Sequence, residues 1–126
     1  MNLVPGHIDG VGEEGAKVRL RDGSKVLAAV RAGEATVGMA VTLGVRSEHL
    51  SLDLSGPGDH IETRVHWVEQ LGDTTFAYLE SAAAQAPVLR LPGETPVNVG
   101  DTLRVRVPPK RAHVFDEQGM AFEKLH

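Results

Sequence analysis

The side chains best suited to chemistry stand at corresponding ends of two similar segments. His49, preceded by Glu48, follows the first segment, whereas Lys110, Arg111 and His113 follow the second. Imidazole donates and accepts hydrogen bonds and titrates near neutral pH, so a pair of histidines is able to hold an anion or a partner loop. The sequence favours a simpler interpretation, in which each histidine bonds a turn carbonyl and packs its ring on the protein.

A second polar group lies in the segment LGDTT, residues 71–75. Hydroxyls and backbone amides at a reversal are able to cradle an oxyanion or a sugar hydroxyl. Asp73 disfavours an anion and suits a polyol better. The favoured interpretation is a turn in which Asp73 and Thr74 satisfy the local backbone.

One group of polar side chains raises the question of metal binding. His60, Glu62, Arg64 and His66 alternate along one predicted strand and therefore share a face. Because Arg64 would repel a cation from that face, we interpret it as a solvent-exposed surface. Trp67 on the same strand is predicted to lie in the core or in an interface, and a sugar-stacking role is less favoured.

Motifs for catalysis are missing from the sequence. It has no phosphate-binding loop, no G-x-S-x-G elbow and no H-E-x-x-H pair. The segment LSGPG at 54–58 resembles the signature loop of ABC ATPases only by chance, since no helix follows it. The 126-residue chain also lacks cysteine. We therefore expect no enzyme activity, no cofactor and no metal site in this chain.

Composition argues against nucleic-acid binding. The formal net charge is −4, and aromatic residues make up only 4% of the chain. A single-strand binder needs a basic groove with stacking aromatic side chains. The start MNLVPG has no basic leader, and no apolar run approaches membrane-spanning length, so we expect a soluble protein.

An internal duplication is the main organising feature of the chain. VGMAVTLGV at 37–45 matches VGDTLRVRV at 99–107 without a gap, and each copy follows a Gly-Glu pair and an apolar run. Each copy also ends at a histidine followed by an apolar residue. A repeated β unit indicates a binding or scaffolding module before it indicates a catalyst.

The elements that must position these groups are short strands. Alternating apolar residues bounded by Gly, Pro, Asp and Asn predict strands at 7–11, 17–21, 25–30, 41–45, 51–54, 61–71, 74–80, 88–91, 102–107, 112–115 and 120–122. Asp22-Gly23 predicts a tight hairpin. The small-residue run at 81–86 predicts a loop. We therefore expect an all-β fold, either one barrel or two small barrels packed together.

One domain is expected from the chain length, with repeat halves at about 1–56 and 60–122. Residues 55–59 (SGPGD) form the predicted linker between these halves. Because each half has an apolar face too small to stand alone, the two faces are expected to bury each other.

Three motifs resemble one family in the same order. They are LGVRSEHL at 43–50, VEQLGDTTFAY at 68–78 and GDTLRVRVPPKRAHVFD at 100–116. Together with the opening MNLVPG, they resemble the C-terminal regulatory region of carbohydrate-importer ABC ATP-binding subunits of the maltose and glycerol-3-phosphate type. That region contains the transport-associated OB-like (TOBE) fold, so the resemblance implies an all-β protein of two intertwined small OB-like barrels from an internal duplication. Ser47 stands where the family usually has proline.

The resemblance implies a regulatory, dimer-forming domain attached to the ATPase core of the same subunit. It further implies a second copy as partner, indirect contact with membrane permease subunits, a cytoplasmic location at the inner membrane and, in the maltose branch, an inhibitory regulatory protein. The expected contact residues are exposed positions at repeat ends and turns: Arg46, Glu48, His49, Asp73, Thr74, Lys110, Arg111 and His113.

One alternative function stays open. Related duplicated barrels bind molybdate-like oxyanions between subunits, so a small-oxyanion or small-solute binding module is the main competitor. Whether the chain is a fragment of a longer subunit or a free-standing module is also open.

Overall fold

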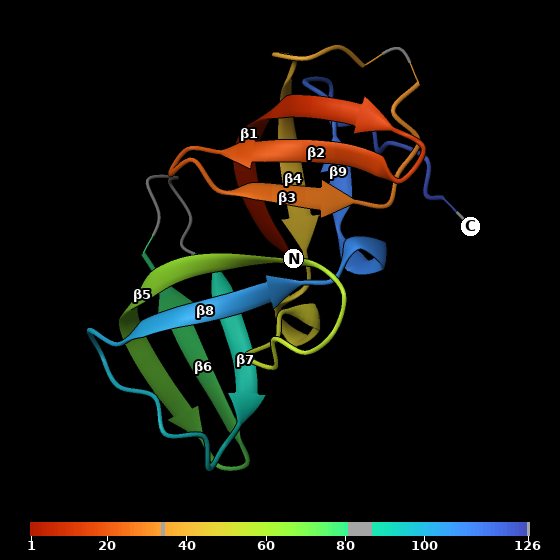
Figure 1. Cartoon of the computed structure of the whole chain (residues 1–126). Helices are drawn as coiled ribbons and strands as arrows, with labels where there is room; N and C mark the ends of the chain where they lie inside the picture. The colour runs from red at the N-terminus through yellow and green to blue at the C-terminus, as the bar shows by residue number, and fades with distance from the viewer. Residues whose placement is uncertain (34, 81–86, 126) are drawn as a thin grey trace.

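The computed structural model describes residues 1–33, 35–80 and 87–125 (Figure 1). Within these ranges the chain forms nine strands and two short 3₁₀ helices, with no α-helix. In order they are β1 (Asn2–Gly12), β2 (Gly15–Leu20), β3 (Lys25–Ala28), β4 (Ala40–Val45), η1 (Ser47–His49), β5 (Asp59–Leu71), β6 (Thr74–Leu79), β7 (Val88–Pro92), β8 (Thr102–Val107), η2 (Pro109–Arg111) and β9 (His113–Phe115). The expected all-β class is confirmed.

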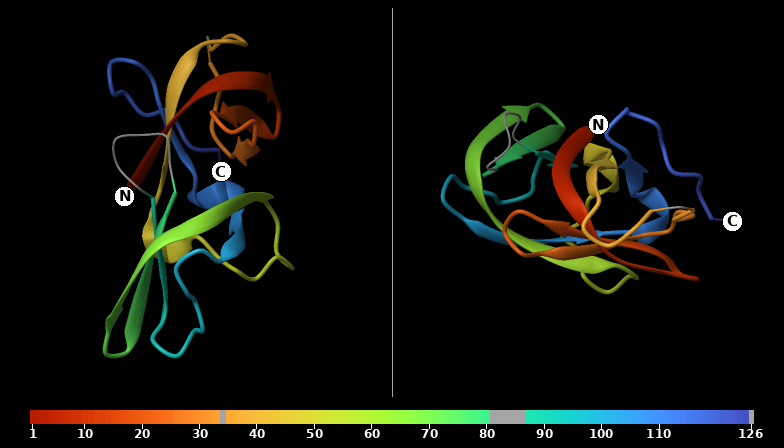
Figure 2. Two further views of the ribbon diagram at one scale, coloured as in Figure 1. Left: turned by 90° about the vertical axis from the view of Figure 1, so that its left-hand side faces the viewer. Right: turned by 90° about the horizontal axis from the view of Figure 1, so that it is seen from above.

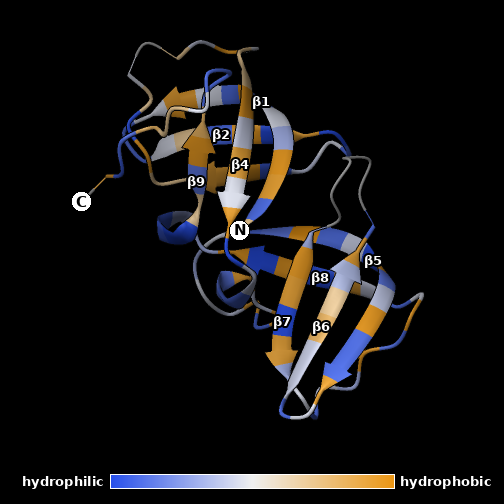
Figure 3. Cartoon of the chain, turned by 180° about the vertical axis from the view of Figure 1, so that it is seen from behind, coloured by the Kyte–Doolittle hydropathy of each residue, from blue (hydrophilic) through white to orange (hydrophobic). Residues whose placement is uncertain are grey.

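The first sheet has the order β3-β2-β1-β4-β9, with antiparallel neighbours throughout. Its strands bury alternate residues: Val41, Leu43 and Val45 of β4 point into the core. Figure 3 shows the resulting bands of apolar and polar colour along the strands. The predicted hairpin between β2 and β3 is present, since Gly23 takes a φ of 92° and Asp22 Oδ1 accepts the Ser24 N–H at 2.9 Å.

The C-terminal segment closes this sheet on itself. Ala121 pairs with Phe115 of β9, and Lys124 pairs with Val30 just beyond β3. The Lys124 ammonium also donates to the Ala112 carbonyl at 2.6 Å. Residues 121–125 therefore bridge the two outer strands, which gives this half its barrel character.

The second sheet has the order β7-β6-β5-β8. A register shift between Val65 and Trp67 of β5 interrupts the alternation. Val65 is 1% exposed, whereas Trp67 is 59% exposed. The prediction of Trp67 in the core is therefore wrong, because the bulge turns its side chain outward; an interface role for it stays a prediction.

The two sheets interlock at their junction, where the N-terminus lies in Figures 1 and 2. After β8 in the second sheet the chain returns as β9 to the first, so Val107 and Val114 pack in the core of the first sheet. Leu50, which follows η1, packs against the cores of both sheets. Each half thus buries part of the other.

Three strand predictions need correction. Residues 51–54 form no strand: only Ser51 pairs, with Arg106, and the Ser51 hydroxyl instead accepts the Asp53 N–H in a local turn. Residues 120–122 likewise contribute only the Ala121 bridge. Residues 25–30 yield a strand ending at Ala28, beyond which Val30 forms a single bridge to the C-terminal segment.

The start of β1 also differs from the prediction, since the strand runs through Pro5 and begins at Asn2. Proline is tolerated there because pairing with β2 starts only at Gly6, so no donor is required on that side. The loop predicted at 81–86 lies outside the described residues. No helix among the described residues is long and apolar enough to cross a membrane.

Candidate functional site

Several of the predicted contact residues come together at the ends of the two repeats. β4 is followed by η1 and β8 by η2, so the matching segments end in matching 3₁₀ turns. Burial lowers the pKa of His113, and the positive charges of Lys124, Arg46 and His49 lower it further. We call Arg46, His49, His113 and Lys124 the repeat-end cluster.

The repeat-end cluster includes one unsatisfied atom. Nδ1 of His49 is buried and has no hydrogen-bond partner among the described residues. The ring of His113 stacks on that of Phe115 of the same strand, with ring centroids 6.4 Å apart and the planes inclined by 26°. Nδ1 of His49 therefore does not bond a turn carbonyl, as the favoured interpretation would require. The ring of His113 does pack on the protein, which agrees with that interpretation.

Charged neighbours surround this cluster. Glu48 is exposed, and a hydrogen bond from its own backbone amide is the main cause that lowers its pKa. The nearby charges of His49 and Arg46 lower the pKa of Glu48 further. Burial lowers the pKa of Lys124, and the nearby charge of Arg111 adds to that effect. Lys110 lies exposed on η2.

The predicted turn at 71–75 lies apart from these groups, at the tip of the β5–β6 hairpin (Figure 1). Its hydroxyls are engaged within the protein. Thr75 is fully buried and donates to the Gly93 carbonyl at 3.2 Å, and Thr74 donates to Asp73 Oδ1 at 3.3 Å. Neither bond joins the side chain of Asp73 or Thr74 to the backbone of the turn, so the favoured interpretation of a self-satisfied turn stays a prediction.

The histidine-bearing face of β5 is open to solvent. His60, Glu62, Arg64 and His66 are all exposed. Among the residues that the structure describes, no group of three or more histidine, aspartate or glutamate side chains is placed to hold a metal ion.

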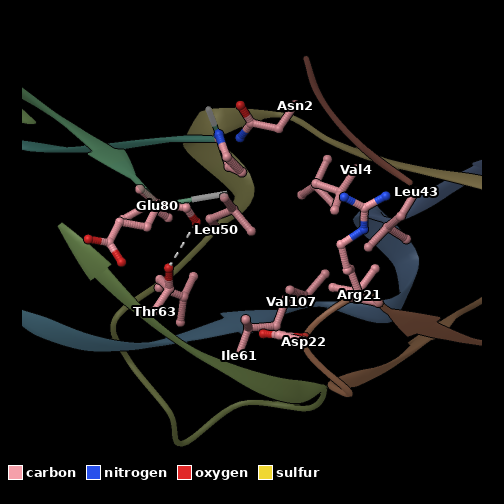
Figure 4. Close-up of a pocket in the computed structure, with 15 residues that line it drawn as sticks. Asn2, Val4, Arg21, Asp22, Leu43, Leu50, Ile61, Thr63, Glu80 and Val107 are labelled. Atoms are coloured by element: carbon pink, nitrogen blue, oxygen red, sulfur yellow. Dashed lines mark hydrogen bonds between the residues drawn. The ribbon is translucent and has the colours of Figure 1, made fainter. Parts of the chain in front are cut away.

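The sequence did not predict a mostly apolar cavity that lies between the two sheets (Figure 4). Its volume is about 240 Å³. We call it the inter-sheet cavity. The side chains that form its walls are mostly aliphatic and come from both sheets: Val4, Leu20, Leu43, Val45, Leu50, Ile61, Leu79, Pro87, Val105 and Val107.

Polar groups lie around the aliphatic walls: Asn2, Arg21, Asp22, Thr63 and Glu80. The Asn2 side chain is 9% exposed and is used by the fold, since it donates to the Val88 carbonyl at 2.7 Å and accepts the Val88 N–H at 2.9 Å. The Thr63 hydroxyl donates to the backbone carbonyl of Glu80 at 3.4 Å. Asn2 therefore joins the two sheets, whereas Thr63 of β5 bonds the end of β6 within the second sheet. Both side chains already have hydrogen-bond partners in the protein.

The class of protein follows from this architecture: an all-β module of two interlocked, OB-like halves. A family model described as the TOBE domain matches residues 43–115, more than half of the chain. The chain therefore belongs to the TOBE domain family.

Known relatives match this chain over essentially its whole length. It is 33% identical over 127 residues to the maltose/maltodextrin import ATP-binding protein MalK of Vibrio cholerae, covering 100% of the chain and 34% of that protein. It is 35% identical over 126 residues to the protein of the same name from Vibrio parahaemolyticus, covering 99% of the chain and 34% of that protein. The chain thus spans about a third of the length of these relatives.

A solved structure confirms the fold. The cytoplasmic molybdate-binding protein ModG, crystallised with molybdate bound, superposes with a TM-score of 0.72 at 17% sequence identity. The alignment covers 90% of this chain and 94% of ModG. At this identity the likeness concerns the fold alone.

Proposed function

We propose that the chain acts as a C-terminal regulatory and oligomerisation domain in the ATP-binding subunit of an ABC importer for sugars or sugar-phosphate-like solutes. The observation that carries this proposal is the 33–35% identity to maltose-importer subunits over essentially the whole chain. ATP hydrolysis would belong to the other two thirds of such a subunit. The domain itself carries out no reaction in this proposal.

The proposed mechanism is mechanical. A domain attached to an ATPase core biases closure of the nucleotide sites if its contacts differ between the open and closed states. The interlocked sheets suit this role because residues of each half pack in the core of the other. The partners are a second copy, the ATPase core, the permease through that core, and a regulatory protein, at the cytoplasmic face of the inner membrane.

The proposed contact residues are Arg46, Glu48, His49, Asp73, Thr74, Lys110, Arg111 and His113. Arg46, Glu48, Lys110 and Arg111 are exposed on or beside the two 3₁₀ turns. Exposed charges at an interface set orientation and association rate more than affinity. Their replacement should therefore change regulation without unfolding the domain.

A chimera tests the proposal. The region of the Vibrio cholerae MalK protein that aligns with this chain is replaced by the chain, and maltose uptake is measured in cells lacking their own subunit. The intact subunit and a subunit truncated at the junction are the controls. We expect uptake above that of the truncated subunit, and Arg46→Glu in the chimera should alter ATP hydrolysis in the assembled transporter. A chimera that assembles but transports no better than the truncated subunit would contradict the proposal.

A second candidate is binding of a small oxyanion. The positive charge of the repeat-end cluster and the fold of ModG favour it. Isothermal titration with molybdate and tungstate separates the two candidates, because micromolar binding that Arg46→Gln abolishes would support the oxyanion module instead.

A further inference from the structure

We infer that the inter-sheet cavity is a binding site for a small, uncharged aliphatic molecule. The inference rests on the cavity alone and does not depend on the importer role. The site would lie between the two halves of the domain, and its lining includes neither a member of the repeat-end cluster nor Asp73 of the hairpin tip.

The walls decide the chemical class. Leu43, Val105 and Val107 are each at most 2% exposed yet line an open volume. Water in such a space finds few hydrogen-bond partners and is displaced readily by an apolar group. A ligand that covers these walls gains free energy from the hydrophobic effect and from dispersion contacts.

Polar ligands fit poorly. None of the described lining residues is aromatic, so no ring is present to stack on a sugar. The side-chain amide of Asn2 already has a partner in the opposite sheet, and the hydroxyl of Thr63 has one at the end of β6 in its own sheet. Sugar hydroxyls or an oxyanion would therefore lose water without receiving equivalent bonds.

The rim does not select a net charge. It carries Arg21 beside Asp22 from the β2–β3 turn, and Glu80 at the end of β6 (Figure 4). Charges of both signs next to one another favour neither a cation nor an anion. A ligand with an aliphatic chain and one neutral polar end fits this site, because the chain contacts the apolar walls and a hydroxyl lies among the polar groups of the rim.

The volume sets the size. An apolar cavity of about 150 Å³ holds benzene, so by proportion about 240 Å³ accommodates about ten non-hydrogen atoms. Linear alcohols near octanol have this size. Because both sheets contribute walls, an occupant contacts both halves and stabilises the native arrangement in proportion to its affinity.

The experiment titrates the 126-residue chain with linear alcohols from butanol to dodecanol and follows Leu, Val and Ile methyl signals by NMR. We expect saturable shifts at Val45, Leu79 and Val105 and none at Val37 and Val99, which are 68% and 60% exposed. The affinity should rise about fourfold per methylene and then level off or fall once the chain outgrows the cavity. Glucose and molybdate should leave these methyl signals unchanged.

Cavity-filling variants localise the site. Val4→Phe fills it from the first sheet and Ile61→Phe from the second, and each should lower octanol affinity at least about tenfold. Leu3→Phe is the matched control, because Leu3 lies next to Val4 in β1 but is 45% exposed outside the cavity. It should leave the affinity unchanged.

Three results would overturn the inference: absence of saturable shifts, affinity that keeps rising through dodecanol, or native-like Val4→Phe and Ile61→Phe proteins that bind octanol as the parent does. The chain-length cut-off is measured on the parent protein, so the test stands even when a filled variant fails to fold. Loss of octanol binding would leave the chimera result untouched.

Discussion

At the scale of single residues, the Asn2 side chain links the two sheets, because it hydrogen-bonds the backbone of Val88 as a neighbouring strand would. Its amide forms both a donor and an acceptor bond to Val88, at 2.7 and 2.9 Å. Asn2→Leu keeps the size but leaves the N–H and C=O of Val88 unpaired, which should reduce the free energy of unfolding by about 1–3 kcal/mol. Urea denaturation measures this loss. Leu3→Ala on the exposed side of β1 is the control, and an equal loss there would show that the Val88 bonds contribute nothing specific.

His113 gives a prediction about pH. Its pKa lies below the ordinary value because of burial first and the charges of Lys124, Arg46 and His49 second. As the pH falls below about 6.5, the unfolded chain takes up a proton that the folded protein still excludes. The free energy of unfolding should therefore keep its full value above that pH and decrease below it. His113→Gln should weaken the decline, as seen in urea midpoints at about pH 8 and about pH 5.

An NMR titration of the His113 ring tests the cause directly. Arg46→Gln removes one repelling charge and should raise the pKa of His113, whereas a charge-preserving Arg46→Lys should change it less. If the pKa stays where it was in Arg46→Gln, the charge of Arg46 is not part of the effect.

At the scale of elements, Arg106 of β8 holds the predicted linker in place. Its guanidinium donates from Nε to the Asp53 carbonyl at 2.7 Å and from Nη1 to the Pro57 carbonyl at 2.9 Å. Arg106→Gln should speed amide hydrogen exchange at 53–58 while leaving β5 and β6 protected. The control is Arg104→Gln, two residues earlier and exposed. Unchanged exchange in Arg106→Gln would mean that the backbone alone orders the segment.

The same segment shows what the sequence could and could not predict about elements. Alternation of apolar residues predicted β4, β5 and β8 to within about two residues, because half-buried strands require that pattern. It failed at 51–54, where Ser51 and Asp53 bond nearby N–H groups and replace a strand with turns. Local side-chain bonding of this kind competes with strand pairing, and the apolar pattern does not reveal which one prevails.

The candidate sites differ in the same way. The repeat predicted that His49 and His113 would lie at equivalent ends of the two repeat copies, and both belong to the repeat-end cluster. The inter-sheet cavity was not predictable, since its walls come from strands far apart in the sequence and its volume depends on how the sheets meet. The way in which the sheets meet is fixed by contacts such as that between Asn2 and Val88, which are 86 positions apart. Contacts over such a separation leave no recognisable pattern in the local sequence.

At the scale of the whole molecule, the two sheets should unfold as one cooperative unit. The chain passes from β8 in the second sheet to β9 in the first, and Leu50 packs against both cores. Neither sheet retains its full core when the other unfolds, so the loss of one removes buried area from the other. During urea unfolding, the methyl signals of Val18 in the first sheet and Leu89 in the second should therefore disappear with one midpoint.

The C-terminal closure offers a way to challenge this cooperativity. Deleting residues 117–126 removes the pairing of Ala121 with Phe115 and of Lys124 with Val30, and it removes the bond from Lys124 to Ala112. The first sheet then has two open edges and a less protected core, so the midpoint should fall. Because the cores are shared, the signals of Val18 and Leu89 should shift to the lower midpoint together. If the Leu89 signal kept the parent midpoint, the halves would be independent units, and the mechanical coupling proposed for regulation would lose its physical basis.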